Sequence, residues 1–207
     1  MKGKLLGLVL VGLLLVMAGC GGGNDERPII ETTIPSDIDV DAHVVDSGGF
    51  LTLTAASPVN GVLAGVNPGN DDVYRAFLQF PLATVPLNAR IRSAQLGIVI
   101  RDLTVLPPTV NVRIRIDLVS FAPPVVATDF DQLSSLGSVI SRPISSIDVN
   151  SEVVVDVTPL MVEAQIQKLK FFQVRISQED DLTTPAPGRI RIDETNENPP
   201  LLTVVYD

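Results

Sequence analysis

The stretch VNVRIRIDL, residues 110–118, decides the fold class. Its apolar side chains stand at every second position, and Asn, Arg and Asp fill the positions between them. Successive side chains of a β-strand point to opposite faces of the sheet, so a period of two indicates a strand with one buried face. The stretch therefore predicts a β-strand and excludes a helix, whose apolar positions would recur every three or four residues.

The same alternation recurs along the chain, in shorter form, from about Ser36 onward. It is found in residues 74–80, 94–100, 153–157, 172–176, 190–192 and 202–206. Clusters of Pro, Gly and Asn separate these segments, and such residues favour turns. They lie at 67–70, 107–108, 123–124, 185–188 and 198–200.

Only one segment has helical spacing. Thr158 can cap a helix, Pro159 suits its first position, and Val162, Ile166 and Leu169 recur at i, i+4 and i+7. Many one-sided strands joined by Pro/Gly turns, with one short helix, predict an all-β fold. We expect a jelly-roll β-sandwich.

The N-terminus has the features of a secretory signal. Two Lys precede an apolar stretch, residues 5–17, and small residues follow it directly before Cys20. An uncleaved transmembrane helix is the alternative, but the apolar segment is too short to span a bilayer. We predict a signal peptide over 1–19, a flexible tether beginning with Cys20 over 20–35, and a β-sandwich domain over 36–207.

The ending Met17-Ala18-Gly19-Cys20 resembles the lipobox of bacterial lipoproteins. This resemblance implies that the Cys20 sulfur carries a diacylglycerol, that the leader is removed, and that palmitate or a similar acyl chain modifies the new amine. Several acyl chains anchor a protein firmly, at about 0.8 kcal/mol per buried CH₂. Because Gly21 follows the cysteine in place of Asp, the resemblance also implies the outer membrane of a Gram-negative cell envelope.

Charge and composition exclude several classes of function. The chain of 207 residues has a formal charge of −9, which becomes −11 when Lys2 and Lys4 leave with the leader. Such an acidic domain argues against nucleic acid as a partner. Cys20 is the single Cys and His43 the single His, so the sequence excludes disulfides, CxxC sites and HExxH metal chemistry. We expect His43 to lie on the polar, solvated side of a strand.

The order of several motifs resembles that of DNRLRE domains, also classed as carbohydrate-binding module family 96. The opening YRAFLQFPL (74–82) followed by ARIRSAQL (89–96) is similar to that family's first conserved segment. VDVT (155–158) and the ending from IDE (192–194) to PLLTVVY (200–206) resemble its later segments. The resemblance covers most of residues 39–207. It implies a jelly-roll module of secreted and surface proteins, with binding of carbohydrate, including alginate, in some members.

Arginines on polar strand positions are the first candidates for ligand binding. Guanidinium groups suit two-pronged contacts with carboxylates, so neighbouring arginines could hold the uronates of an acidic polysaccharide. The candidates are Arg75, Arg113, Arg115, Arg189 and Arg191. The alternative is that these arginines pair with Asp117, Glu152, Asp156 or Asp193 across strands, and the net negative charge favours this pairing.

Aromatic side chains are the usual platforms for sugar rings, but the chain has no Trp. Most of its seven Phe and two Tyr fall on inward strand positions. Phe77, with Arg75 and Gln79, and Phe50, with Thr52 and Thr54, are the exceptions. We therefore add Phe77 to the candidate ligand-binding residues and expect that Phe50 could also be exposed.

Acidic residues at turns suggest a structural calcium ion, the one cofactor that the sequence does not exclude. Asp129 with Asp131, and Asp193 with Glu194, supply the hard oxygen ligands that a structural calcium ion prefers. Neither pair has the spacing of a dedicated calcium loop, so ordinary solvated carboxylates are the alternative.

These observations predict a lipid-anchored envelope protein that acts by recognition, with a polysaccharide as ligand. No nucleophile elbow, metal-binding His or cofactor loop is present in the sequence, so we expect no catalytic residues and no enzyme. The alternative function is a structural envelope or surface-assembly protein that binds a protein partner.

Overall fold

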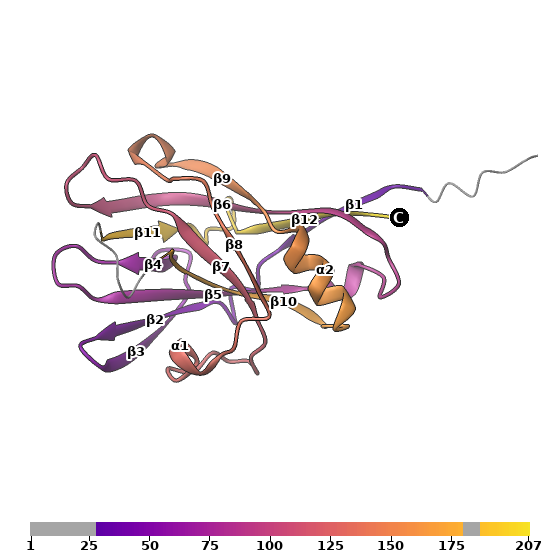
Figure 1. Cartoon of the computed structure of the whole chain (residues 1–207), viewed down its shortest axis with the longest axis horizontal. Coiled ribbons are helices and arrows are strands. Elements are labelled where there is room, and N and C mark those ends of the chain that lie inside the picture. The colour runs from indigo at the N-terminus through magenta and orange to yellow at the C-terminus, as the bar shows by residue number, and fades with distance from the viewer. Residues whose placement is uncertain (1–27, 180–186) are drawn as a thin grey trace, which may run out of the picture.

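A computed structural model describes residues 28–179 and 187–207 (Figure 1). Within these ranges the chain forms twelve strands, two short α-helices and two 3₁₀ turns. The strands are β1 (Ile30–Pro35), β2 (Ala42–Ser47), β3 (Phe50–Ala55), β4 (Val62–Val66), β5 (Val73–Pro81), β6 (Ile91–Val105), β7 (Ile114–Val119), β8 (Gly137–Ile140), β9 (Ser151–Asp156), β10 (Phe171–Gln178), β11 (Gly188–Ile192) and β12 (Leu201–Tyr206). The helices are α1 (Asp129–Gln132) and α2 (Thr158–Ile166), and the 3₁₀ turns are η1 (Leu82–Thr84) and η2 (Ser146–Asp148).

All strand pairs are antiparallel, and they form one continuous sheet that folds into two layers. The order along the sheet is β1-β12-β6-β11-β4-β5-β10-β7-β8. β9 lies on the other edge of β6, β2 lies on the other edge of β5, and β3 pairs with the free edge of β2. In Figure 1, β7 and β8 run obliquely across the front of the molecule. The predicted all-β sandwich is confirmed.

The main core lies between the two layers. One layer contributes alternate residues of β4, β6, β11 and β12, and the other contributes alternate residues of β5, β7 and β10. In the stretch 110–118 that decides the fold class, Val112, Ile114, Ile116 and Leu118 are fully buried, as the period of two predicts. At one end of the sandwich α2 packs against β6 and β8.

The helix exists where it was predicted, but its buried face is different. Leu160, Met161 and Ala164 enter the core, whereas Val162 and Ile166 are exposed. Six of the nine helix residues are apolar, and the three polar residues, Thr158, Glu163 and Gln165, do not form a single stripe, so spacing alone could not identify which side packs on the sheet. The buried side of the helix is determined by its packing against β6 and β8.

The domain also begins earlier than predicted. Residues 30–35, which the sequence analysis assigned to the tether, form β1 and pair with β12 from Ile30↔Tyr206 to Pro35↔Leu201. Only Ile34 of this edge strand is fully buried, so its alternation is short and weak. The predicted signal peptide, Cys20 and the first part of the tether lie outside the described residues. Among those described, no helix is long and apolar enough to cross a membrane.

A second apolar cluster covers the outer face of β2 and β5. Residues 119–133, which carry α1, lie over this face and bury Phe121, Val125 and Phe130 against Val44 and Phe77. The sequence analysis treated this face as solvated. The cover explains why β10 is buried on both sides, although half of its residues are polar.

Two buried arginines hold this cover in place. Arg175 on β10 binds Asp117 on β7, with 2.8 Å from Nη2 to Oδ2, and donates to the main-chain oxygen of Leu133. Arg75 on β5 donates to the main-chain oxygen of Phe130 at 2.6 Å and stacks on its ring, with Cζ 4.1 Å from the centroid. These contacts satisfy charges that would be costly if buried alone.

The two layers join at a very short ladder between β4 and β5. Only Gly65↔Tyr74 and Val66↔Val73 are paired there. Gly65 has φ +107°, and a Cβ at this position would overlap the main-chain oxygen of Gly188 on β11. The close approach of β4 to β11 therefore requires a glycine at this position.

Substitution of Gly65 should destabilise the fold at this junction. We expect Gly65→Ala to lower the free energy of unfolding by more than about 1 kcal/mol, because the positive φ and the close backbone both oppose a Cβ. Chemical denaturation is the measurement. Gly69→Ala is the matched control, since its Cβ would meet only the side chain of Asn67 at 3.6 Å; equal losses in the two variants would contradict the prediction.

The buried ion pair between Arg175 and Asp117 should contribute far more to stability than the pair between Arg75 and the exposed Asp131. Asp117→Asn leaves Arg175 buried without its counter-charge, and we expect a loss of about 3 kcal/mol or more in urea unfolding. Asp131→Asn is the comparison, because Asp131 binds the similarly buried Arg75 but is itself 69% exposed. Its loss should stay below about 1 kcal/mol. A larger loss for Asp131→Asn than for Asp117→Asn would refute this account of the cover.

Candidate functional site

Two of the candidate ligand-binding residues lie inside the protein. Phe77 is fully buried in the second apolar cluster, and Arg75 is 6% exposed beneath α1. The expectation that Phe77 could be exposed is therefore wrong, and neither side chain presents a surface to a ligand. Strand parity placed both on the outer face correctly, but parity does not show that residues 119–133 cover that face.

Two further candidates, Arg113 and Arg115, lie at the start of β7. Arg115 is partly buried, and its Nε lies 3.3 Å from Oδ1 of Asp117, a partner that the pairing alternative named. Arg113 is exposed just before the strand, and its main-chain oxygen accepts a hydrogen bond from Glu179. The two arginines expected to form a row therefore have different surroundings, and only Arg113 is without an ion pair among the described residues.

The last two candidates, Arg189 and Arg191, lie on β11 and belong to a shared surface. In antiparallel ladders, directly opposite residues point to the same face. The registers give one continuous cross-strand row through five ladders: Thr104, Arg189, Gly65, Tyr74, Val45 and Thr52. A second row begins with Asp102, Arg191 and Leu63. We call the surface formed by Arg189, Arg191, Tyr74, Thr104 and Thr52 the arginine–tyrosine face.

Side chains on this face are accessible and close together. Arg189, Arg191 and Tyr74 are each partly exposed. The Arg189 guanidinium lies over the Tyr74 ring, with 5.3 Å from Cζ to the centroid, and donates to Oγ1 of Thr104 at 3.3 Å. Gly65 stands between Arg189 and Tyr74 in the row and has no side chain to separate them.

Neither arginine of the face forms an ion pair within residues 28–179 and 187–207. By contrast, Arg92, Arg101, Arg142 and Arg175 each bind an Asp. Asp102 is the carboxylate directly opposite Arg191, yet no ion pair forms between them in the described chain. The Nε of Arg191 is buried without a hydrogen-bond partner. These two guanidinium groups therefore retain donors for a ligand.

His43 borders the face and is buried, not solvated as expected. It is 5% exposed, and its ring centroid lies 6.0 Å from that of Tyr74. Burial, reinforced by the charges of Arg189 and Arg191, lowers the pKa of His43 to about 4. The imidazole is therefore neutral at pH 7, and the positive charge of this region comes from the two arginines.

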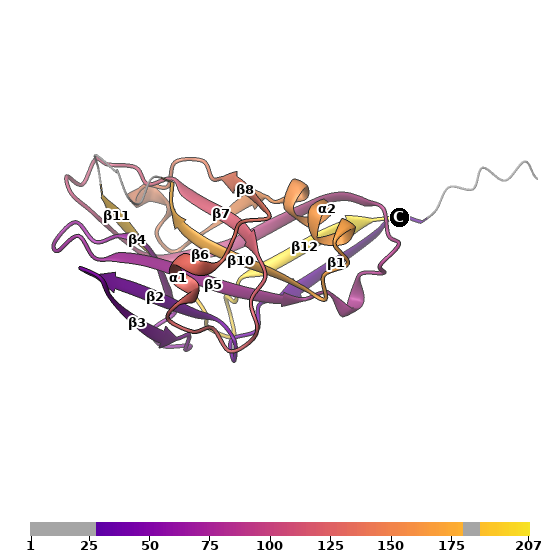
Figure 2. The ribbon, with the colours of Figure 1, turned by 60° about the horizontal axis from the view of Figure 1, so that its bottom comes forward.

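An exposed aromatic side chain lies at the edge of the same surface. Phe50, at the start of β3, is 79% exposed, which confirms the expectation for this residue. It shares the strand face of Thr52 because the two are two residues apart. Figure 2 shows β3 and β2 beside β5 at this side of the molecule.

Tyr74 is a candidate site residue that the sequence analysis missed. Its parity groups it with Ala76, Leu78 and Phe80, which enter the main core. At the β4–β5 ladder, however, this side of β5 passes from the interior to the surface, so Tyr74 is only partly buried. The turn cluster at 67–70 marks the end of the β4–β5 hairpin and was the available signal that Tyr74 lies near its rim.

The acidic candidates for calcium fall into two unlike sets. Asp129 accepts from the main chain of Val126, and Asp131 binds Arg75, so both have structural partners around α1. Asp193 binds Arg101 and accepts from the main-chain nitrogen of Thr195. Glu194 is 2% exposed. In the part of the chain that the structure describes, no three His, Cys, Asp or Glu side chains converge as a metal site.

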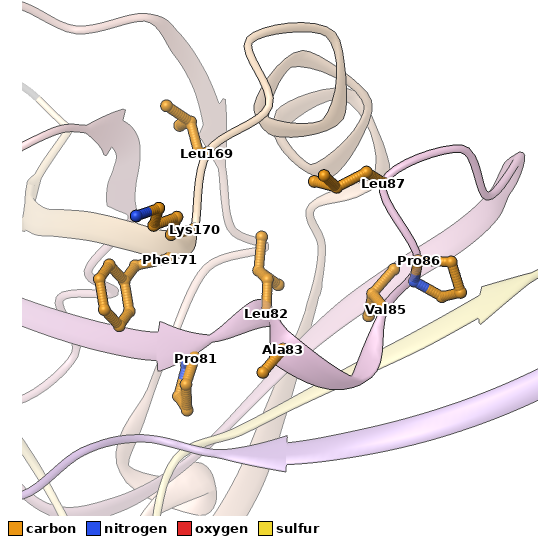
Figure 3. A pocket seen from close by; sticks show the side chains of 9 residues that line it. All are labelled: Pro81, Leu82, Ala83, Val85, Pro86, Leu87, Leu169, Lys170 and Phe171. Carbon is orange, nitrogen blue, oxygen red and sulfur yellow. The ribbon is translucent and has the colours of Figure 1, made fainter.

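A pocket lies at the opposite end of the molecule, between η1 and the start of β10 (Figure 3). Its volume is about 430 Å³. Its lining is apolar apart from Lys170, and Pro81, Leu82, Val85, Leu87 and Phe171 form most of the wall. This lining lacks the two carboxyl groups that hydrolysis of a glycosidic bond requires.

Comparison with known proteins adds no relative. No protein-family model matches the chain, and no curated protein matches it. The likeness to DNRLRE domains and to lipoproteins therefore remains an expectation based on the motifs quoted above.

Proposed function

We propose that this protein is a lipid-anchored recognition module of the cell envelope that binds acidic polysaccharide without catalysis. The observation that supports the proposal is the pair of arginines on β11, Arg189 and Arg191, which have no ion pair in the described chain; Arg189 also lies over the Tyr74 ring. Of the candidates predicted from the sequence, these two share an accessible surface with an aromatic ring.

The chemistry of the face suits uronate residues. A guanidinium group donates two parallel hydrogen bonds to a carboxylate, and each charge-assisted bond is stronger than a neutral one. Tyr74 and Phe50 offer ring faces for the apolar side of a sugar. Thr52 and Thr104 add hydroxyl groups that exchange hydrogen bonds with sugar hydroxyls.

The net charge of the protein sets a condition on this binding. A charge of −11 repels a polyanion at long range, so attraction must come from the local field of the two arginines. Screening at physiological ionic strength limits the long-range repulsion to about 8 Å. The burial of His43 in a neutral form leaves the arginines as the cations of this region, so the attraction should not depend on pH between 6 and 8.

The position of the face suits an anchored receptor. The described chain begins at Pro28 beside the C-terminus, at the right of Figure 1, whereas β3, β4 and β11 extend to the left. Seven residues lie between Cys20 and Pro28, and the eight residue steps span at most about 28 Å. An anchor at Cys20 would hold the C-terminal end nearest the membrane and direct the arginine–tyrosine face outward.

Lipid attachment should depend on Cys20 alone. We expect metabolic labelling with a palmitate analogue to mark the wild-type protein and to leave Cys20→Ser unlabelled, because the thiol is the acceptor. Fractionation should move the variant from the membrane to the soluble fraction. Labelled Cys20→Ser protein would contradict the anchor.

Glycan binding should require the arginine–tyrosine face. We expect Arg189→Ala/Arg191→Ala to weaken binding to immobilised polyuronate at least tenfold, because two charge-assisted contacts are lost. Tyr74→Ala should weaken binding several-fold through lost stacking. Surface plasmon resonance on the detergent-purified full chain measures both effects, and raised salt should weaken wild-type binding.

Control variants distinguish binding at the arginine–tyrosine face from nonspecific attraction by any exposed arginine. Arg90→Ala removes an exposed arginine at the C-terminal end, where its main chain pairs with Asp207, and should leave binding unchanged. Arg113→Ala tests a sequence-predicted candidate that also has no ion pair in the described chain. If Arg113→Ala abolishes binding and the double variant does not, the site is misplaced. If wild-type protein binds no acidic or neutral glycan, the recognition proposal fails and a protein-binding role takes its place.

A further inference from the structure

Two buried carboxyl groups meet where three distant segments of the chain come together. Asp41 lies just before β2, Glu194 follows β11, and Ser36 follows β1. The hydroxyl of Ser36 donates to Oε2 of Glu194 at 3.4 Å and also lies against the carboxyl group of Asp41. Asp41 and Glu194 are 1% and 2% exposed.

One oxygen of each carboxyl group has no partner. Oδ1 of Asp41 accepts from the main-chain nitrogen of Gln79 at 2.8 Å, but its Oδ2 is buried without any hydrogen bond. Oε1 of Glu194 is likewise buried and without a hydrogen bond. Most buried polar atoms in proteins are satisfied, so two orphan acceptors in one cluster call for a specific explanation.

No positive side chain of the described residues compensates these two groups. Arg101 binds Asp193, the neighbour of Glu194 in sequence, and forms no ion pair with Glu194. Asp37 and Asp193 add further negative charge around the cluster. Burial raises the pKa of Asp41 to about 8 and the pKa of Glu194 to about 9, so both carboxyl groups are neutral at pH 7 unless a cation stabilises their charged forms.

We propose that Asp41 and Glu194 bind a calcium ion, with the Ser36 hydroxyl as a neutral ligand. Carboxylate and hydroxyl oxygens are hard donors of the kind that Ca²⁺ prefers. Mg²⁺ usually retains several of its waters, which suits an exposed site better than one buried from solvent. Two carboxylates would neutralise the ion, and further neutral oxygens would complete its shell.

The proposed calcium site does not depend on glycan recognition, and the ion would have a structural role. Glu194 was among the calcium candidates from the sequence, but its expected partner Asp193 is occupied by Arg101. The partner that the fold supplies is Asp41, 153 positions earlier in the chain. A bound ion would join the end of β1, the start of β2 and the end of β11.

Calcium binding can be tested on the full chain, purified in mild detergent and stripped with a chelator. Isothermal titration with CaCl₂ should give one site per chain. At a free calcium concentration of about 100 times the dissociation constant, the melting temperature should rise by about 5 °C or more. MgCl₂ should bind at least tenfold more weakly.

Isosteric variants locate the site. Asp41→Asn and Glu194→Gln should each weaken calcium binding at least tenfold, and the double variant should show no thermal response to calcium. Asp39→Asn and Glu197→Gln are matched controls, since both residues are exposed, within three positions of the ligands and chemically identical to them. These controls should bind calcium as the wild type does.

Three results would overturn the proposal. The first is a stripped wild-type protein that neither releases heat with calcium nor melts at a higher temperature, which would identify the cluster as a neutral carboxyl pair. The second is a double variant that retains the full calcium response. Should the variants fail to fold, crystals of the wild-type chain grown with calcium decide the matter: an anomalous peak between Oδ2 of Asp41 and Oε1 of Glu194 supports the site, and a peak elsewhere or no peak rejects it.

Discussion

The close approach of β4 to β11 at Gly65 is the constraint on which the rest of the structure depends. Two residue pairs join β4 to β5, and this narrow ladder is the place where one continuous sheet divides into two layers. Because the sheet divides there, β5 faces the main core along Ala76, Leu78 and Phe80 but reaches the surface at Tyr74. The same glycine leaves room for Arg189 to reach the Tyr74 ring. The fold and the candidate site thus share one structural cause.

The buried polar layer beneath α1 illustrates how this protein uses its arginines. Arg75 donates to the main-chain oxygen of Phe130, and Arg175 donates to the main-chain oxygen of Leu133 and to Asp117. These bonds hold residues 119–133 against the sheet. Arg189 and Arg191 have the same chemistry but face an accessible surface. The contrast depends on what covers each strand, because all four arginines lie at polar strand positions.

Alternation along the chain was enough to predict β5, β6, β7, β9, β10, β11 and β12 and the core-facing residues of β6 and β7, since a period of two reports directly on burial of one sheet face. It could not predict which outer face is covered, and this is why Phe77 and Arg75 were placed with the ligand-binding candidates. His43 lies on the opposite face of β2, opposite Ala76, and its burial beside Tyr74 was also not predicted from alternation. The helix was predicted at the correct residues, yet its apolar side chains gave no information on its packed side. Pairing of Asp41 with Glu194 was also beyond local sequence, because only the sheet topology brings β1, β2 and β11 together at that point.

The antiparallel pairing of β1 with β12 has a mechanical consequence. β1 starts at the end of the molecule nearest the proposed anchor, and it runs toward the end that bears the arginine–tyrosine face. A pull between a membrane anchor and a bound ligand would therefore act along the axis of β1. In that direction the hydrogen bonds of the β1–β12 ladder are sheared together and share the load, whereas a pull across the strand would open them one at a time. The edge strand that first meets the force is thus oriented to withstand it.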